Sequence, residues 1–408
     1  MFSPSFDHRF LFSDTARSLT AFKKVDGETY YVPRDGQEPM GPLSNLIDFV
    51  HDYFPPGTID TAFLCDPGTD DFMTGMLAFD RRSRLRPFIV VPSFGNVSGE
   101  KTYKNALTMV SLMGAFGVAV GKGAQKPLEG PMPEDASGEH GMDGLGGAKP
   151  RNAQMVEDNI PLITQHADGI KVLKEEIIRR NQGKGRPVAI LSTGSMTDVY
   201  HLLAALDREN PAAITKISGI SLMGGGIDTQ RRHTNVSDHA EFNIYQDPVA
   251  AHEAFKLIHR YGIPTIVFPL DLTHTTGVRQ SFEGAWMREQ ADKNGNDVAD
   301  MAAQLFKAGE FDVKRSRDIF GFAEDKITRF MHDPNVVTGL DKPYLYEGFN
   351  ATVNIRTEGE EKGRTVVRSS PNSKTFVVVK ADTACVIECW QQRISTYSVC
   401  PDLAHAPK

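Results

Sequence analysis

The stretch IDTAFLCDPGTDD, residues 59–71, decides which fold class we expect for this chain. Its first part, Ile59–Cys65, is an apolar run of strand length, which predicts a buried β-strand. The turn Pro67-Gly68 follows, and Asp70–Phe79 then places apolar residues at helical spacing on one face. A buried strand that turns directly into a helix is typical of the units from which parallel sheets are built.

The same alternation of apolar strands and amphipathic helices continues along the chain. Four more apolar runs predict strands, at Pro87–Val91, Val188–Leu191, Ile217–Met223 and Ile263–Phe268. Helical patterns lie between and beside them, for example at Thr102–Gly114 and Asp247–Tyr261. Strands that are apolar throughout and alternate with helices indicate a parallel sheet with helices on both faces. We therefore predict an α/β fold with an open, mostly parallel, Rossmann-like sheet.

The sequence divides into three segments. Residues 1–58 lack a clear hydrophobic period apart from one expected helix around Leu43–Phe54, so we interpret them as an N-terminal extension. Residues 59–372 are expected to form the main domain, and residues 373–408 a C-terminal helix and tail packed on the same domain. The Gly- and Pro-rich stretch Glu129–Gly147 predicts a long loop, and such loops in compact domains are often functional.

Composition and charge argue against some classes of partner. The chain has 408 residues, of which 40% are hydrophobic and 24% charged, and its formal net charge is -7. A mildly acidic protein has no general attraction for phosphate backbones, so we expect no nucleic-acid partner. No stretch has the pattern of a signal peptide or a membrane span, and we expect no membrane association. The four cysteines lack zinc-ligand spacing, so we interpret them as free thiols of a cytoplasmic protein.

Three carboxylates follow the first predicted strand. In open parallel sheets ligands bind beyond the carboxyl ends of the strands, where Asp66, Asp70 and Asp71 are expected. Such crowded carboxylates repel one another unless a cation is present, and an all-oxygen set favours Ca²⁺ or Mg²⁺. The alternative for Asp70 and Asp71 is ordinary stabilisation of a helix N-terminus by negative charge.

Further polar residues follow two later predicted strands. Asp271 would add a fourth carboxylate, although an aspartate after a strand is also a common helix cap. Asn235, Glu241 and Asn243 follow the strand that ends at Met223. Their amides and carboxylate suit hydrogen bonds to sugar hydroxyls, and the competing interpretation is turn chemistry.

Taken in order, these motifs resemble one family, the inosine-uridine preferring nucleoside hydrolases. The matching segments, in chain order, are CDPGTDD at 65–71, GN at 95–96, NAL at 105–107, HGMDGLG at 140–146, TGSMTD at 193–198, MGGG at 223–226, AEFN at 240–243, LDLTH at 270–274, HDP at 332–334 and GRTVV at 363–367. The series spans Ile59 to Val367, about three quarters of the chain. The resemblance implies the fold expected above, here as the nucleoside hydrolase fold.

The resemblance also implies a calcium site. Asp66, Asp71 and Asp271 match positions that supply carboxylate ligands to Ca²⁺. Thr193 matches a position that supplies its backbone carbonyl, so its side chain is expected to matter little. Asp66 is further expected to be the base that takes a proton from the attacking water.

The remaining site residues are assigned to the sugar and the base. The positions implied to bind ribose are Asp70, Asn96, Asn235, Glu241 and Asn243. Asn243 is also expected to stabilise charge on the ribose ring during the reaction. His140 matches a histidine near the leaving base, and His274 and His233 are the alternatives for protonating that base.

The activity implied is hydrolysis of the N-glycosidic bond of purine or pyrimidine ribonucleosides, giving ribose and free base, by a homodimer or homotetramer in nucleoside salvage and catabolism. Two alternatives stay open: a hydrolase of a modified N-riboside, and a non-catalytic nucleoside- or ribose-binding protein on the same scaffold. Three positions depart from the family pattern. Leu64 replaces an aspartate, Asp198 replaces an asparagine, and Leu270 stands where some members carry a base-protonating histidine.

Overall fold

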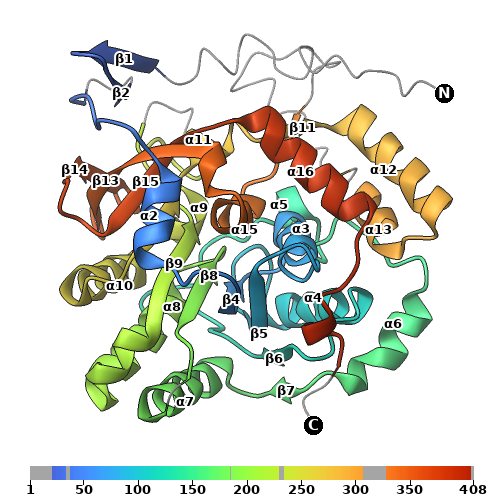
Figure 1. Cartoon of the computed structure of the whole chain (residues 1–408). Coiled ribbons are helices and arrows are strands. Elements are labelled where there is room, and N and C mark those ends of the chain that lie inside the picture. Colours follow the sequence, from blue (N-terminus) through green and yellow to red (C-terminus); the bar gives the residue numbers. More distant parts are fainter. Residues whose placement is uncertain (1–20, 34–36, 184, 229–233, 307–327, 406–408) are drawn as a thin grey trace.

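A large β-sheet forms the centre of the protein. The computed structural model describes residues 21–33, 37–183, 185–228, 234–306 and 328–405. Among them, eleven strands form one sheet in the order β14-β13-β15-β10-β9-β8-β4-β5-β6-β7, with β3 paired to β13 (Figure 1). The strands are β3 (Ser44–Asn45), β4 (Ile59–Cys65), β5 (Leu85–Pro92), β6 (Ala119–Gly121), β7 (Gln165–His166), β8 (Val188–Ser192), β9 (Ile217–Met223), β10 (Thr265–Phe268), β13 (Tyr346–Ile355), β14 (Thr365–Ser369) and β15 (Thr375–Ala381).

The direction of the strands confirms the predicted sheet. From β15 through β10, β9, β8, β4, β5 and β6 to β7, every neighbouring pair is parallel. Only β13 and its partners β14 and β3, at one edge, pair antiparallel, together with the β13–β15 contact. All five strands predicted from apolar runs are present, and two of them, Ile59–Cys65 and Ile217–Met223, have the predicted ends.

The order of the parallel strands creates a crevice in the middle of the sheet. From β4 the chain adds β5, β6 and β7 in one direction, and it then returns to place β8 on the other side of β4. The connections that leave β4 and β8 therefore diverge, and they open a gap at the carboxyl ends of these two strands. Asp66 follows β4 and Thr193 follows β8, so the fold brings both residues to this gap.

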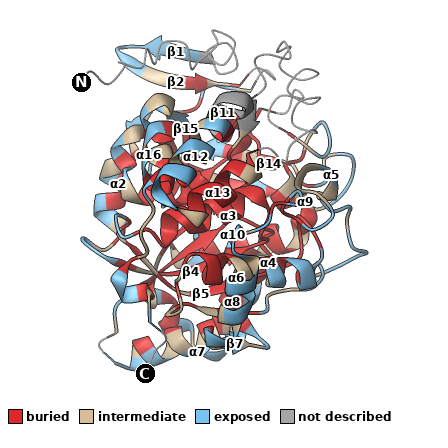
Figure 2. Cartoon of the chain, turned by 90° about the vertical axis from the view of Figure 1, so that its right-hand side faces the viewer, coloured by how far each residue is buried: buried red, intermediate tan, exposed pale blue. Residues whose placement is uncertain are grey.

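Helices cover both faces of the sheet, and the side chains of β4 are therefore buried on both faces. Phe63 of β4 packs with α3 (Thr69–Ala78), α4 (Gly99–Leu112), α15 (Pro334–Asp341) and α16 (Thr383–Ser395) in one apolar cluster. Leu64 packs with α7 (Gly169–Gln182), α8 (Thr197–Glu209) and α10 (Pro248–Tyr261) in the other. Buried residues accordingly concentrate along the strands and the inner faces of the helices (Figure 2). No helix among the described residues is long and apolar enough to span a membrane.

The N-terminal segment lies at the rim of this body. Strands β1 (Ala21–Val25) and β2 (Glu28–Val32) form an antiparallel hairpin outside the large sheet (Figures 1 and 2). The helix predicted around Leu43–Phe54 is present as α2 (Leu46–Tyr53), and its apolar face packs into the core.

The C-terminal segment forms a strand in addition to the expected helix and tail. The helix is α16, but Thr375–Ala381 before it forms strand β15, which lies between β10 and β13. The run TFVVVKA has five buried residues in succession, as an interior strand requires. The sheet therefore continues past residue 372.

The remaining elements of the described chain are helices, 3₁₀ turns and one pair of strands. The helices are α5 (Ser137–His140), α6 (Ala153–Asn159), α9 (Phe242–Gln246), α11 (Leu270–Thr273), α12 (Gln280–Asn294) and α13 (Asp297–Leu305), and the 3₁₀ turns are Ile160–Leu162, Pro211–Lys216, Pro343–Leu345 and Pro401–Leu403. Strands β11 (Gly277–Arg279) and β12 (Thr328–Phe330) pair antiparallel, and β12 leads directly to α15.

Candidate active site

Carboxylates and amides gather at the carboxyl ends of β4, β5 and β8. Asn96 follows β5, and its backbone N–H donates to Asp66 Oδ2 at 2.9 Å. Its side-chain Nδ2 donates to the Asp66 carbonyl at 3.0 Å and to Asp71 Oδ2 at 3.1 Å. Thr193 Oγ1 donates to Asp71 Oδ1 at 2.6 Å. Asn96 was expected on the ribose, and in the structure its amide group fixes the two aspartates.

Three aspartates at the starts of two helices form a group that could hold a metal ion. One carboxylate oxygen from each of Asp70, Asp71 and Asp333 lies within 4.8 Å of the other two, and all three residues are buried. Asp70 and Asp71 open α3, and Asp333 precedes α15. Asp66 lies outside this 4.8 Å group but is fully buried beside it.

The chemistry of these groups fits a hard cation. Asp66 Oδ1 is buried and has no hydrogen-bond partner among the described residues, so it is free to bind a ligand. Burial, and then the neighbouring carboxylates, raise the pKa of Asp66 and of Asp333 well above the usual carboxyl range. Burial and Asp70 raise the pKa of Asp71 to about 7. A divalent cation offsets this crowding of negative charge, and the donors are all oxygen, as Ca²⁺ and Mg²⁺ require.

Asp271, expected as a metal ligand, is not brought to this group. Its Oδ1 accepts hydrogen bonds from Tyr31 Oη at 2.5 Å and from the Asp228 N–H at 3.0 Å. Its Oδ2 accepts from the Ile227 N–H at 2.7 Å. The carboxylate is thus engaged by three donors, which satisfy its charge without a cation. In the structure Asp333, and not Asp271, stands beside Asp70 and Asp71.

Thr193 and Asn243 meet in the gap at the carboxyl end of β8. Asn243 Nδ2 donates to the Thr193 carbonyl at 2.8 Å, which leaves Asn243 Oδ1 without a partner among the described residues. The Thr193 side chain was expected to matter little. The structure differs, because its hydroxyl is one of the donors that hold Asp71.

Glu241 builds the start of α9 at this gap. Its carboxylate caps the helix by accepting from the Asn243 N–H at 2.8 Å and the Ile244 N–H at 3.1 Å. It also accepts from the Gly225 N–H at 2.8 Å, which ties α9 to the loop after β9. Asn235 Oδ1 accepts from the Phe242 N–H at 2.7 Å. The residues expected on the ribose therefore lie together, and part of their bonding capacity holds this wall in place.

Two histidines line the cavity between these groups. His140 ends α5, and its Nδ1 accepts from the Thr69 N–H at 3.1 Å, which puts the ring proton on Nε2. His332 precedes Asp333, and its Nδ1 lies 2.7 Å from Thr273 Oγ1. His274 is not among the lining residues. It is buried, and its ring meets that of His332 edge to face, with the ring centroids 5.5 Å apart. His233 lies outside the described residues.

The cavity itself is small, and it adjoins a larger one. It has a volume of about 60 Å³ and is lined by carboxylates, amides and the two histidines: Asp70, Asn96, His140, Thr193, Asn235, Glu241, Asn243, His332 and Asp333, with Ala136, Glu139, Met223 and Phe242. A neighbouring cavity of about 650 Å³ shares four of these residues, Ala136, Glu139, Asn235 and Phe242.

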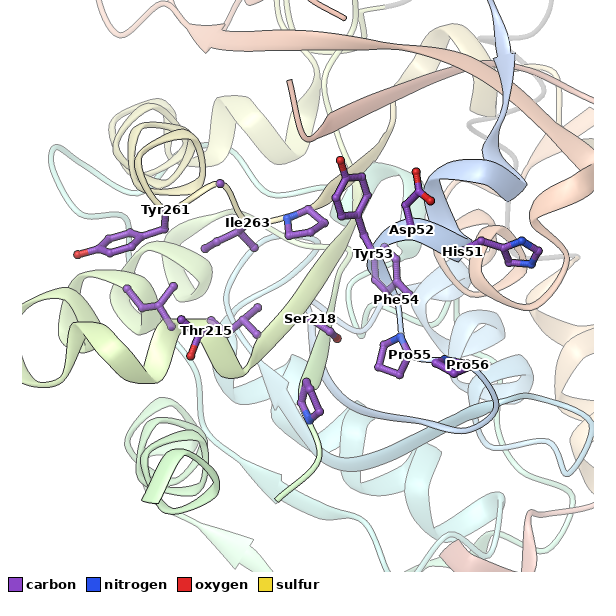
Figure 3. Close-up of a pocket in the computed structure, with 15 residues that line it drawn as sticks. His51, Asp52, Tyr53, Phe54, Pro55, Pro56, Thr215, Ser218, Tyr261 and Ile263 are labelled. Carbon is purple, nitrogen blue, oxygen red and sulfur yellow. The ribbon is translucent and has the colours of Figure 1, made fainter. Parts of the chain in front are cut away.

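A separate cavity lies at the amino ends of the strands, away from the candidate site. It measures about 530 Å³ and lies between the end of α2 and the starts of β9 and β10, with Tyr53, Phe54, Ser218 and Ile263 on its walls (Figure 3). Ligands of open parallel sheets bind at the carboxyl ends, and this cavity is at the amino ends. It contains none of the carboxylates of the group around Asp71.

A sequence model of the family described as inosine-uridine preferring nucleoside hydrolase matches residues 62–388. The chain belongs to the inosine-uridine preferring nucleoside hydrolase family. Members of this family are enzymes that act on N-glycosyl bonds. The match extends beyond residue 372 and includes β15, in agreement with the place of that strand in the sheet.

Individual nucleoside hydrolases agree with this assignment. The pyrimidine-specific ribonucleoside hydrolase RihA of Salmonella typhimurium is 30% identical over 344 residues, which cover 82% of this chain and 97% of RihA. The structure resembles that of a purine-preferring ribonucleoside hydrolase from Gardnerella vaginalis, with a TM-score of 0.66, 22% identity, and coverage of 82% of this chain and 98% of that one. A plant nucleoside hydrolase gives a TM-score of 0.65 at 21% identity, covering 84% and 100% of the two chains.

Two residues of the site, His332 and Asp333, were given no role from the sequence, although they lie in one of the matching motifs. His332-Asp333-Pro334 is among the matching motifs, but the metal ligand from the later part of the chain was predicted at Asp271, in the motif at 270–274. Both aspartates follow a short strand and begin a helix, so the local patterns are alike. Their tertiary environments distinguish them.

Proposed function

We propose that this protein is a calcium-dependent ribonucleoside hydrolase that releases free base and ribose. The observation that carries the proposal is the cavity lined by the carboxylates of Asp70 and Asp333 and by the amides of Asn235 and Asn243. The buried carboxylate of Asp71 lies beside those of Asp70 and Asp333. Such a set offers a cation site and sugar-hydroxyl partners in one place. Family membership supplies the reaction class.

The ribose would lie against the groups with unused bonding capacity. The Asp70 carboxylate accepts no hydrogen bond from the described residues, and Asn243 Oδ1 is likewise free to accept from a sugar hydroxyl. Glu241 holds the helix that carries Asn243, so it fixes the direction of this amide. These contacts would orient the sugar and support the positive charge that develops on its ring as the base departs.

The proposed cation ligands are the carboxylates of Asp66, Asp71 and Asp333 and the carbonyl of Thr193. When bound there, Ca²⁺ would hold sugar hydroxyls and polarise a water molecule. Asp66 is positioned to take the proton of the attacking water, because its Oδ2 is held by Asn96 and its Oδ1 has no other partner. Asn96 and Thr193 keep Asp66 and Asp71 in place while the proton moves.

Protonation of the departing base would come from a histidine of the cavity. His140 can donate through Nε2, because its Nδ1 is fixed as an acceptor by Thr69. His332 is the second candidate, since it lines the same cavity beside Asp333. A histidine precedes the aspartate in His332-Asp333, whereas a leucine precedes it in Leu270-Asp271. A His140→Ala and His332→Ala comparison distinguishes them: loss of the proton donor lowers kcat by about 100-fold or more.

The decisive experiment measures release of reducing sugar from inosine, uridine, cytidine, adenosine and guanosine, with Ca²⁺ or with a chelator. We expect calcium-dependent hydrolysis of at least one nucleoside and loss of turnover in Asp66→Asn, since the amide cannot accept the proton. Asp207→Asn, at a partly exposed ion pair with Arg260 outside the residues that line the cavity, is the control and should retain wild-type rates. Absence of turnover, with retained nucleoside binding, would leave a binding protein as the function.

A separate prediction tests the ligand set. Asp333→Asn should weaken calcium binding by about 100-fold, because ligand charge sets the affinity of such sites. Asp271→Asn should leave calcium affinity unchanged, since its carboxylate is engaged by Tyr31 and two backbone amides. The measurement is the calcium concentration that half-maximally raises the melting temperature. The reverse ranking of the two variants would restore Asp271 as the ligand.

The neighbouring cavity supports a second candidate substrate. The neighbouring cavity of about 650 Å³ adjoins the small cavity in which the sugar would lie, here called the sugar cavity, and the two share Glu139 and Phe242. Its volume is of the size that drug-sized ligands occupy. A modified N-riboside with a bulky substituent would use this space, whereas a common nucleoside leaves most of it empty. Comparing kcat/KM between plain and substituted nucleosides decides between them; a higher value for the plain ones argues against this substrate class.

A further inference from the structure

We propose that Tyr31, in the N-terminal segment, is a positioning residue for the active site. It acts through Asp271 on the loop Gly224–Asp228 that follows β9, and through that loop on Glu241. The inference rests on the proposed function for its kinetic consequence, and its structural part stands independently. It gives a role to a segment outside the family match and to a carboxylate that is not a metal ligand.

The first contact of this chain of interactions is between Tyr31 and Asp271. Tyr31 is only 1% exposed, although most of its hairpin is at the surface. Its hydroxyl donates to Asp271 Oδ1 at 2.5 Å. Two backbone hydrogen bonds of 2.8 Å to Met40 hold the tyrosine in this position. Asp271 is completely buried, so each donor to its carboxylate matters for keeping the charge satisfied.

The second step leads from Asp271 to the loop. The same carboxylate accepts the N–H groups of Ile227 at 2.7 Å and Asp228 at 3.0 Å. The neighbouring Leu270 N–H donates to the Gly225 carbonyl at 2.8 Å. The N-terminal segment also reaches the loop directly, because Gln37 Nε2 donates to the Ile227 carbonyl at 3.0 Å.

The third step leads from the loop to the cavity. The Gly225 N–H donates to Glu241 Oε2 at 2.8 Å, and Gly225 needs its positive φ of 85° to present that N–H. Glu241 and Met223, at the two ends of this connection, both line the sugar cavity. A shift of the loop would therefore move the carboxylate that caps α9 and directs Asn243.

The test compares Tyr31→Phe with Tyr30→Phe. Tyr30 is the adjacent residue of the same strand, and among the described residues its hydroxyl donates to the exposed Glu28 alone, at 3.2 Å. Each substitution removes one hydroxyl, so the pair controls for changes in the hairpin itself. We expect faster amide hydrogen exchange at 224–228 in Tyr31→Phe and no change there in Tyr30→Phe.

The kinetic result expected of Tyr31→Phe is a KM raised about tenfold with kcat changed less, because contacts to the bound sugar are loosened in ground and transition states alike. The calcium concentration for half-maximal activity should not change. Combining Tyr31→Phe with Asp271→Asn should give less than the sum of the two effects, since both act on one path.

The outcomes separate this inference from the proposed function. If the wild-type protein hydrolyses no nucleoside, the proposed function fails, and the exchange measurement still decides the inference. Unchanged exchange at 224–228 in Tyr31→Phe overturns it. A changed calcium requirement without a KM effect also overturns it, because Asp271 would then act at the metal.

Discussion

Asp198 shows how a single residue can cost the folded state free energy. It is buried in the first turn of α8, where its Oδ1 accepts the Ala124 N–H at 2.9 Å. Its Oδ2 is buried and has no partner among the described residues. Burial raises the pKa of this carboxyl to about 7. The matching family position carries asparagine, a neutral side chain of the same shape.

The first prediction concerns this carboxyl and pH. The native state keeps the Asp198 proton up to about pH 7, whereas the unfolded chain loses it near the usual value of about 4. The contribution to stability is therefore present below about pH 4 and is lost as pH rises toward about 7. Asp198→Asn should raise the free energy of unfolding at pH 8 and have little effect at pH 4.5. Urea unfolding of both proteins at the two pH values checks this, and an equal difference at both would contradict it.

Asp271 and Asp333 show how far residue-level reasoning reaches. Each follows a strand and starts a helix, and each is buried. The sequence predicted that Asp271 joins Asp71, and it assigned no role to Asp333. Which one does depends on the groups that surround it. Asp271 meets a tyrosine and two backbone amides, whereas Asp333 meets carboxylates.

At the scale of elements, the connection after β5 is shaped by a close approach to the one after β4. A Cβ on Gly95 would lie 1.9 Å from Asp66 Oδ2, far inside van der Waals contact. Gly68, before α3, is similarly crowded, with its Cβ position 2.6 Å from Asn96 Nδ2. The two connections can exchange hydrogen bonds only because both positions lack a side chain.

The second prediction tests this packing. Gly95→Ala should displace the Asp66 carboxylate and lower kcat/KM by about 100-fold or more, as misplacement of a reacting group does. Gly183→Ala is the matched control, because its nearest neighbour would be 3.7 Å away. The measurement is steady-state nucleoside hydrolysis at saturating Ca²⁺. Wild-type kinetics in Gly95→Ala would show that Asp66 is placed differently from the structure.

The elements themselves were largely predictable, and the exceptions have physical causes. The five predicted parallel strands stand out because each is a short apolar run between helices. Strand β13 was not predicted, since it alternates buried and partly exposed residues within a polar stretch. Strand β14 overlaps the segment at 363–367 that resembles a late strand of the family. Strand β15 was missed for a different reason. Its apolar run lies beyond the motifs, and only its neighbours β10 and β13 place it inside the sheet.

At the scale of the whole molecule, Arg393 joins the C-terminal helix to the helices of the site. It lies on α16 and is 4% exposed. Its guanidinium bonds to Asp341 Oδ2 at 2.8 Å at the end of α15, and to the Leu77 carbonyl in α3. It also faces Asp80 Oδ1 at 3.6 Å. The helices that carry Asp71 and follow Asp333 are therefore fixed to each other through the C-terminal segment.

The third prediction concerns this junction. Arg393→Met should lower the free energy of unfolding by about 3–5 kcal/mol, because it leaves Asp341 buried without its cation. Arg260→Met removes an exposed partner of Asp207 and should cost less than about 1 kcal/mol. Urea unfolding of the three proteins gives the comparison. Equal losses in the two variants would show that the buried pair does not stabilise the fold.

The sequence by itself determined the parallel α/β sheet, the family, and the position of Asp66, Asp70 and Asp71 at the end of its central strand. These features depend on hydrophobic patterns and motifs that are local in the chain. Only the tertiary structure decided that Asp333 joins the aspartates and that Asp271 binds Tyr31, 240 residues away. The reason is physical: a carboxylate takes its role from the donors and charges that packing places around it, and no local pattern specifies them.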